Sequence, residues 1–198
     1  MTAPSPAGRS PAPLATREID TPLGPMLGAA TDGGVCLLEF TDRRALATEL
    51  RELDRGLGRT PPDTRATADP FEHLDHLSDE LSAYFAGVIT RFSVPLVPAG
   101  SAFERGVWDL LMAIPYGRTT SYGAIARQLG QPGASRAVGR ANGRNRIAIV
   151  IPCHRVIDSS GGLHGYGGGL HRKRYLLELE MTFSGAGSLW PPALAGAH

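Results

Sequence analysis

Residues 121–142 read SYGAIARQLGQPGASRAVGRAN and predict two short helices joined by a tight turn. We expect the first helix over about 122–129, where Gly130 ends it, and the second over about 134–142. Three apolar residues share one face of the second helix and can pack inward: Ala134, Val138 and Ala141. Two helices across a glycine-containing turn are typical of a helix-turn-helix unit, whose second helix contacts DNA.

Another face of the second predicted helix carries a row of arginines, Arg136, Arg140 and Arg144, each four residues from the next. Such a row is usually a solvated helix surface. Here it lies in a basic half of the chain, because residues 98–198 have 11 Lys and Arg against 5 Asp and Glu. Residues 1–97 have 9 Arg against 14 Asp and Glu, so the two halves carry net charges of +6 and −5. The asymmetry favours a nucleic-acid partner for the second half, with chance partition of surface charge as the alternative.

The sequence on either side of these helices predicts a mainly helical domain over residues 98–183. It opens with a capping box, Ser101-Ala-Phe-Glu104, which starts a helix. The further expected elements are, in order, that helix with its apolar stripe over 103–114, a buried strand over 147–151, a glycine-rich loop over 161–169 and a last helix over about 171–180. Pro152 ends the strand, so we expect Cys153 at a strand end or a turn.

The first half predicts a small α/β domain over residues 17–97 with no recognisable catalytic motif. Its expected elements are, in order, strands within 16–20, 26–31 and 35–40, a helix over 42–57 capped by Thr41, a polar loop over 59–70, a helix over about 71–85 and a strand over 92–96. The Pro-, Ala- and Ser-rich ends, residues 1–16 and 184–198, are expected to be disordered tails.

The composition excludes several classes of protein. No apolar run approaches the ~20 residues that cross a bilayer, and the N-terminus has no hydrophobic segment of a secretory signal. The two cysteines, Cys36 and Cys153, are too few for a secreted disulfide scaffold. We therefore expect a cytoplasmic protein, in which a free thiol stays reduced.

Cys153 is the candidate nucleophile. A lone cysteine after a buried strand is most often a small core residue, and that interpretation stays open. The functional interpretation rests on His154 and Arg155, because a base and cations near a thiol of ordinary pKa about 8.5 raise its thiolate fraction. Neighbouring side chains on an extended chain point apart, so a bridging water would join Cys153 to His154. Glu180, in the last predicted helix, could orient the imidazole.

A zinc site and a cysteine hydrolase are the other interpretations of this thiol. Cys36 and Cys153 lie far apart in a sequence with no C-x-x-C or H-x-x-x-H spacing, which argues against zinc. Cys36 lies in an apolar run and is expected in the core. A hydrolase would also need a thiolate and a histidine, but no oxyanion hole or peptide cleft can be identified, and it would not explain the arginine row.

The segment IPCHRV at 151–156 resembles the active-site motif of the methylated-DNA–protein cysteine methyltransferases, the O6-alkylguanine-DNA alkyltransferases. The resemblance covers about residues 17–183 and is densest over 103–180. Five motifs stand in the order and spacing of that family: SYGAIA, SRAVGRAN, IPCHRV, GYGGGL and KRYLLELE. Residues 21–46 are further similar to the alkyltransferase module of bacterial adaptive-response regulators, whose methyl-phosphotriester sensor and activator domains have no counterpart here.

The resemblance implies an N-terminal α/β domain of ribonuclease-H-like topology and a C-terminal winged helix-turn-helix domain. It implies a monomeric DNA repair enzyme that flips O6-alkylguanine, and possible further substrates such as O4-methylthymine, out of double-stranded DNA. The alkyl group passes to Cys153 irreversibly, once per molecule and without a cofactor. The alternative is an alkyltransferase-like protein that binds lesions without transfer, which is expected to lack the acceptor cysteine; a winged-helix regulator is a weaker third interpretation.

The resemblance also implies roles for single residues. His154, a water and Glu180 would activate Cys153, while Asn145 braces the active-site turn and Tyr122 contacts the guanine and supplies a proton. The implied substrate-binding and DNA-binding residues are Arg136, inserted where the base was, with Ser121, Ala137, Arg140, Arg144, Val156, Tyr166 and Gly167.

The sequence departs from the family pattern at two points. Arg146 follows Asn145 where the family usually has proline. Some relatives hold zinc through a cysteine pair that this sequence lacks, so no metal site is expected.

Overall fold

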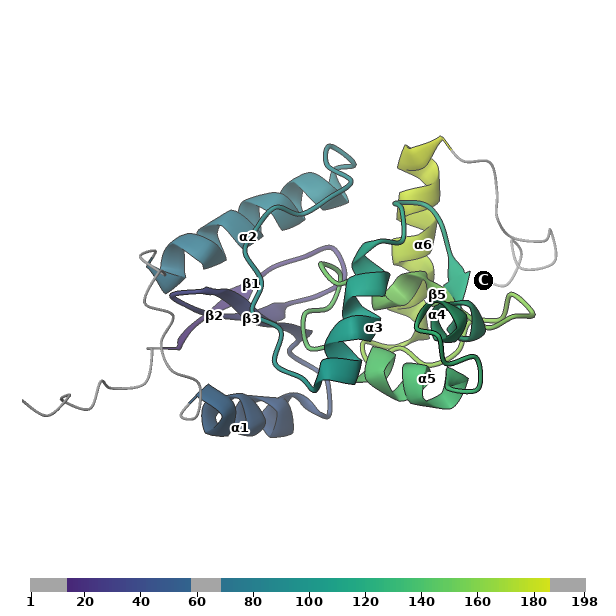
Figure 1. Cartoon of the computed structure of the whole chain (residues 1–198). Coiled ribbons are helices and arrows are strands. Elements are labelled where there is room, and N and C mark those ends of the chain that lie inside the picture. The colour runs from purple at the N-terminus through teal and green to yellow at the C-terminus, as the bar shows by residue number, and fades with distance from the viewer. Residues whose placement is uncertain (1–13, 58–68, 186–198) are drawn as a thin grey trace, which may run out of the picture.

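A three-stranded antiparallel sheet forms the centre of the first half (Figure 1). The computed structural model describes residues 14–57 and 69–185. The strands β1 (Ala15–Ile19), β2 (Met26–Thr31) and β3 (Gly34–Phe40) pair in chain order. Gly34, at the start of β3, has φ 137°, and a side chain there would meet the backbone of Pro95. Only glycine suits this close approach.

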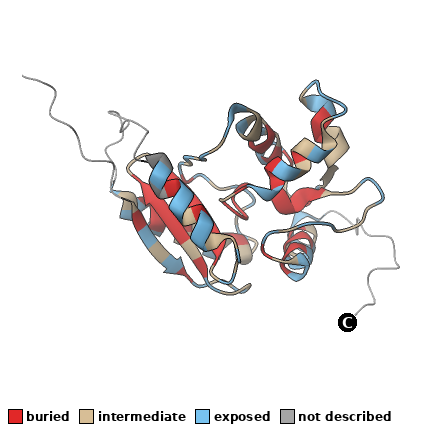
Figure 2. Cartoon of the chain, turned by 90° about the horizontal axis from the view of Figure 1, so that it is seen from below, coloured by how far each residue is buried: buried red, intermediate tan, exposed pale blue. Residues whose placement is uncertain are grey.

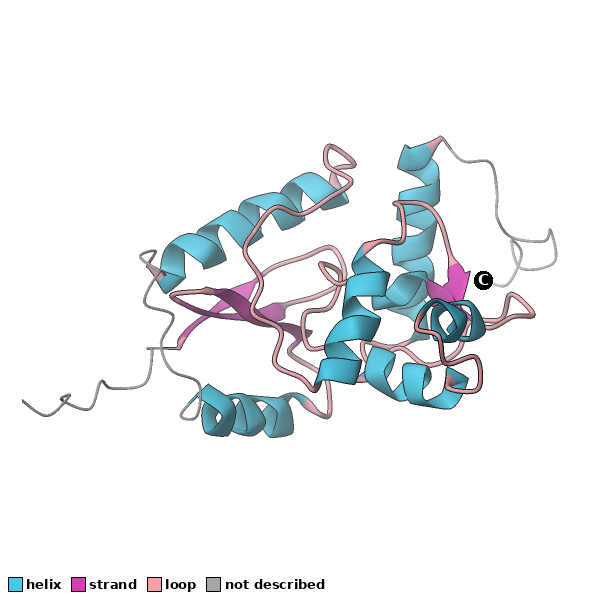
Figure 3. Ribbon diagram, viewed as in Figure 1, coloured by secondary structure: helices cyan, strands magenta, loops and turns pink. Residues whose placement is uncertain are grey.

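Helices cover both faces of this sheet (Figure 3). The helix α2 (Pro70–Phe85) packs Leu74, Leu77 and Leu81 on one face, and α1 (Leu46–Leu57) buries Leu53 on the other. Every residue of β3 is buried as a result. The strand therefore reads as a nearly continuous apolar run rather than an alternating one.

The second half is mainly helical. Its elements are α3 (Ala102–Met112), β4 (Thr120–Ser121), α4 (Tyr122–Gln128), α5 (Ser135–Gly143), the 3₁₀ turn η1 (Cys153–Arg155), β5 (Val156–Ile157) and α6 (Leu170–Ser184). The predicted helices and the capping box of α3 are confirmed. Trp108 Nε1 donates to the Ala141 carbonyl at 2.9 Å and ties α3 to α5. The parallel pair β4–β5 was not predicted, because strands of two residues leave no pattern in a sequence.

The predicted strand over 147–151 is wrong. These residues are buried, but they form a tight turn in which Ile151 N donates to the Ile147 carbonyl at 3.0 Å. Ile149 has φ 71°, a left-handed conformation that costs a β-branched residue energy. Buried apolar runs do not distinguish a strand from a buried turn, which explains the error.

Other boundaries also differ from the sequence predictions. The helix α1 begins at Leu46, so Thr41 does not cap it; Thr41 Oγ1 donates instead to the Pro25 carbonyl. Residues 92–96 form no regular strand, and only Val35 and Leu96 pair, since Pro95 has no N–H to donate. The strand β1 includes two residues assigned to the N-terminal tail. The helix α6 continues to Ser184, which was assigned to the C-terminal tail, and Gly185 caps its end. Residues 1–13 and 186–198 of the predicted tails, and the loop at 58–68, lie outside the described residues.

The first half touches the second through β3. Leu38 N donates to the Arg146 carbonyl and Ala148 N to the Leu38 carbonyl, both at 2.8 Å. Buried residues occur in both halves (Figure 2), and one hydrophobic cluster includes members of each. The sheet thus supports the segment that leads to Cys153. In the described part of the chain, none of the helices has the length and apolarity to span a membrane.

Candidate active site

Cys153 opens the 3₁₀ turn η1 and lies at a cavity of about 320 Å³. Its side chain is buried, with 6% of the residue exposed. The cavity is lined from both halves of the chain, by Glu39, Arg43, Tyr122, Gly139, Asn142, Gly143, Asn145, Ala148, Cys153 and the loop 165–168. The sequence prediction of a cysteine presented at a turn is confirmed.

Two buried asparagines shape the turn that carries Cys153. Asn145 Nδ2 donates to the Ile151 carbonyl at 2.8 Å, and Asn145 Oδ1 accepts from Ile147 N at 3.0 Å. Asn142 Nδ2 reaches the Cys153 carbonyl at 3.4 Å. These hydrogen bonds pair backbone groups that would bond to a neighbouring strand if the segment belonged to a sheet. They stabilise the turn in which Ile149 adopts its left-handed conformation.

A buried network of charged side chains lies behind the thiol. His154 Nε2 is 2.8 Å from Glu180 Oε1, and both side chains have no exposed surface. Arg155 Nε lies 2.9 Å from Glu180 Oε2, and Gly117 N donates to the same oxygen at 3.0 Å. Burial raises the pKa of Glu180, but His154 and Arg155 outweigh it and hold that pKa well below the ordinary range. Glu180 is therefore a carboxylate.

His154 has one nitrogen available for proton transfer. Because Nε2 faces a carboxylate, it carries the proton, and Nδ1 can accept one. Nδ1 is buried without a hydrogen-bond partner among the described residues. Burial lowers the pKa of His154, although Glu180 opposes this. The imidazole is thus poised as a neutral base.

The thiol itself is held in its neutral form. Burial raises the pKa of Cys153 to about 11, while the hydrogen bond from Asn145 and the charges of Lys173 and Arg43 oppose the rise. An isolated thiolate at neutral pH is therefore unfavourable here. Proton transfer to a nearby base would form the thiolate together with a cation that stabilises it.

Sequence reasoning missed Lys173, which is fully buried in the first turn of α6. Its ammonium donates to the Val156 carbonyl at 2.6 Å and to the His164 carbonyl at 2.9 Å, joining the glycine-rich loop to the active-site segment. Burial lowers the pKa of Lys173 to about 8, against the opposite effect of Cys153 and Asp158. A basic residue in a helix gave no sign of this burial.

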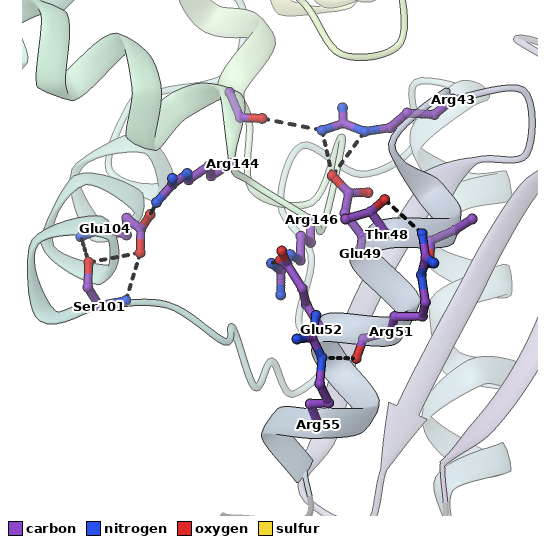
Figure 4. Close-up of polar contacts among 12 residues, drawn as sticks. Arg43, Thr48, Glu49, Arg51, Glu52, Arg55, Ser101, Glu104, Arg144 and Arg146 are labelled. Atoms are coloured by element: carbon purple, nitrogen blue, oxygen red, sulfur yellow. Dashed lines mark hydrogen bonds and ion pairs between the residues drawn. The ribbon is translucent and has the colours of Figure 1, made fainter.

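Sequence reasoning also missed a charged cluster from the first half. Arg43 Nη2 donates to Glu49 at 2.8 Å (Figure 4) and to the Gly143 carbonyl at 3.3 Å. Arg43 Nη1 lies 3.2 Å from Glu39. Burial raises the pKa of Glu39 to about 8, although Arg43 lowers it. Arg43 thus reaches from the first half to the carboxyl end of α5, where a cation is favourable.

Two predicted pocket residues face the same cavity as Cys153. Tyr122, the first residue of α4, follows Ser121, whose hydroxyl caps that helix by accepting from Ala124 N at 3.2 Å. Burial raises the pKa of Tyr122, with Cys153 and Asp158 adding to the rise. The Tyr166 hydroxyl is buried and has no hydrogen-bond partner in the described ranges of the chain.

The predicted arginine row is not uniform. Arg136 and Arg140 are exposed on α5, and Ala137 is half-buried between them. Arg144 instead follows the helix and donates to Glu104 Oε1 at 2.9 Å (Figure 4). Arg146 pairs with Glu52 of α1. The regular spacing of the three arginines therefore predicted more unpaired arginines on this face of α5 than the structure has.

Comparison with known proteins shows the family to which a chain with this site belongs. A family model described as the DNA-binding domain of 6-O-methylguanine DNA methyltransferase matches residues 102–182. The methylated-DNA–protein-cysteine methyltransferase of Mycobacterium tuberculosis is 49% identical over 166 residues, which are 84% of this chain and 92% of that protein. The chain belongs to the methylated-DNA–protein-cysteine methyltransferase family. The Methanosarcina acetivorans member is 42% identical over 161 residues, 81% of this chain and 94% of that protein.

Solved structures of methyltransferases share the fold. A crystal structure of Mycobacterium tuberculosis O6-methylguanine methyltransferase has a TM-score of 0.70 and 44% identity, covering 85% of this chain and 93% of that one. The Pyrococcus kodakaraensis O6-methylguanine-DNA methyltransferase has a TM-score of 0.54 and 26% identity, covering 85% and 99%. This chain is accordingly a mixed α/β member of the methyltransferase family.

Proposed function

We propose that this protein repairs alkylated DNA by moving a methyl or other alkyl group from O6 of guanine to Sγ of Cys153. The observation that carries the proposal is a buried thiol at a cavity, followed in the same turn by a buried imidazole that Glu180 orients. A membrane or secreted function has no comparable support. Membership of the methyltransferase family, and a crystal structure of the Mycobacterium tuberculosis OGT in complex with DNA, support DNA as the partner.

Proton transfer precedes the chemical step. A water between Sγ and His154 Nδ1 passes the thiol proton to the imidazole, and Glu180 stabilises the imidazolium. The thiolate then attacks the alkyl carbon. The S–C bond forms as the C–O6 bond breaks, and the electron pair goes to the guanine ring. The product is a thioether, which no group in the site can reverse.

The leaving guanine gains a proton from Tyr122. Tyr122 borders the cavity at the start of α4, and its raised pKa keeps the hydroxyl protonated until charge develops on the base. The imidazolium returns its proton to solvent, and Tyr122 recovers one. Val156 has a carbonyl that already accepts from Lys173, and its second lone pair is suited to the guanine amino group. The Cys153 carbonyl accepts from Val156 N and from Asn142 Nδ2, so it would bind the same amino group in place of the 3.4 Å contact with Asn142. Tyr166 and Gly167 would line the O6 side.

The target atom is buried in a duplex, so the nucleotide must leave the stack. Flipping costs a few kcal/mol, and an inserted side chain stabilises the gap. Arg136, exposed on α5, is the residue we assign to the gap. We assign Arg140 and Ala137 of α5, and Ser121 at the start of α4, to contacts with the phosphates. Arg144 is a weaker candidate for a DNA contact, because it already pairs with Glu104.

We infer finer features of the fold as well. The sheet between two helices supports a ribonuclease-H-like N-terminal domain over 17–97, extended to Ala15 by β1. The pair α4–α5 with the short strands β4 and β5 supports a winged helix-turn-helix domain over 98–183. A lesion-binding protein without transfer remains the alternative function, and the acceptor Cys153 argues against it.

Mass spectrometry after incubation with duplex containing O6-methylguanine tests the proposal. The intact mass should rise by one methyl group, on Cys153, with Cys36 unmodified, because Cys36 is in the core and donates to the Ala29 carbonyl at 3.4 Å. Restored guanine should never exceed one per protein molecule. Repeated turnover, or a lesion that is bound but unchanged, would contradict single-use transfer.

A further inference from the structure

A tyrosine of the first half reaches the carboxylate behind the active site. The Tyr84 hydroxyl donates to Glu180 Oε1 at 2.7 Å. Tyr84 lies near the carboxyl end of α2, which approaches α6 (Figure 1), and a side chain at Gly87 just beyond that end would collide with Phe183 of α6. Residues 96 positions apart thus meet across the junction of the two halves.

The position of this hydroxyl is fixed. Tyr84 and Glu180 have no exposed surface. The Tyr84 ring packs against Phe85, Phe92 and Tyr116, with ring centroids 5.5, 5.3 and 5.9 Å away. A donor held by three rings beside a buried carboxylate is shielded from bulk water, so its bond to the carboxylate is strong.

Tyr84 shares its acceptor atom with the histidine. Glu180 Oε1 accepts from the Tyr84 hydroxyl and from His154 Nε2, and Arg155 Nη2 donates to it at 2.9 Å. The groups that face Glu180 and His154 come from four segments: Tyr84 of α2, Tyr116 and Gly117 after α3, His154 and Arg155 of η1, and Lys173 of α6. Among these groups, Tyr84 has the one hydroxyl that donates a hydrogen bond to Glu180 Oε1, the oxygen that faces His154.

We propose that Tyr84 is a positioning residue for alkyl transfer, whose hydroxyl fixes Glu180 Oε1 and reduces the negative charge that this oxygen presents to His154. The inference rests on the proposed function of Cys153 and His154. It makes the basicity of the relay depend on the first half of the chain. A hydroxyl that draws charge from Oε1 weakens the stabilisation of imidazolium, so it keeps His154 neutral to lower pH.

Removal of the Tyr84 hydroxyl should raise the pKa of His154. Tyr84→Phe keeps the packed ring and removes the donor, so Oε1 becomes a stronger acceptor and the pKa of His154 rises. His154 accepts a proton only when neutral, so the acid limb of the transfer rate should move to higher pH by roughly half a unit to one unit. Replacing Tyr84 with 3-fluorotyrosine, a stronger donor, should move it the other way.

Tyr116→Phe is the matched control. Its ring packs in the same cluster, but its hydroxyl has no hydrogen-bond partner among the residues that the structure describes. Its removal should leave the acid limb in place. Melting temperatures of all variants check that each one folds.

The experiment has two measurements. Single-turnover transfer from saturating duplex containing O6-methylguanine is followed between about pH 5 and 9. The titration of the His154 ring is followed by NMR in the DNA-free protein, which needs no transfer. Opposite shifts for Tyr84→Phe and fluorotyrosine, in both measurements, are expected. Unshifted profiles, or a rate lowered equally at every pH, would overturn the role of Tyr84. A wild-type protein that never alkylates Cys153 would instead overturn the proposed function, while the NMR titration would still decide whether Tyr84 sets the pKa of His154.

Discussion

Cys153→Ser is expected to abolish alkyl transfer while leaving the protein able to bind duplex that contains O6-methylguanine. Removal of an attacking nucleophile lowers rates by several orders of magnitude in other enzymes. A serine hydroxyl is scarcely ionised, and the relay of His154 and Glu180 cannot make up the difference. The measurement is the single-turnover rate of methyl loss from labelled duplex, with binding measured separately by titration.

The second cysteine provides the matched control. Cys36 is buried in β3, packs with Ala29, Leu37 and Leu53, and burial raises its pKa to about 11. Cys36→Ser should transfer one methyl group per molecule at the rate of the wild type. Normal transfer by Cys153→Ser would mean that another residue is the acceptor.

Local elements of the fold could be predicted from the sequence. The capping box at Ser101 and Glu104 and the stops near Gly130 gave helices whose bounds agree within one or two residues. The reason is that caps and apolar periodicity act within a few residues. The motif at 151–156 likewise identified Cys153 and His154, which the structure brings to one turn.

What could not be predicted depends on contacts between distant segments. The bracing role of Asn145 came from the family resemblance alone, and apolar patterning predicted a strand where Asn145 holds a turn at 147–151. The strand β3 also contacts the first residue of that turn, because Leu38 pairs with Ile147. Glu39 and Arg43 read as ordinary charges beside an apolar strand, although both line the cavity. Tyr84 read as one residue of an amphipathic helix. The contacts of these residues form only where the two halves of the chain meet, so patterns within one segment cannot predict them.

Two arginines of α5, Arg136 and Arg140, are expected to contact DNA in different ways. Arg136→Ala is expected to slow transfer from duplex about 10- to 100-fold even at saturating DNA, because loss of the inserted side chain makes the flipped state less favourable by roughly 1–3 kcal/mol. A free benzylated guanine base needs no flipping, so its reaction with Cys153 should hardly change. The measurement is the single-turnover rate on both substrates.

Arg140→Ala is the matched control for this prediction, because Arg140 is exposed one turn further along the same helix. An arginine that only meets phosphate should weaken binding and reduce the salt slope by roughly one unit, with little change in rate at saturating DNA. Arg144→Ala should weaken binding less than Arg140→Ala, since Arg144 is already held by Glu104 at 2.9 Å. Equal losses on duplex and free base for Arg136→Ala would show that Arg136 supports the pocket or the fold, because only the duplex reaction requires a nucleotide to leave the stack.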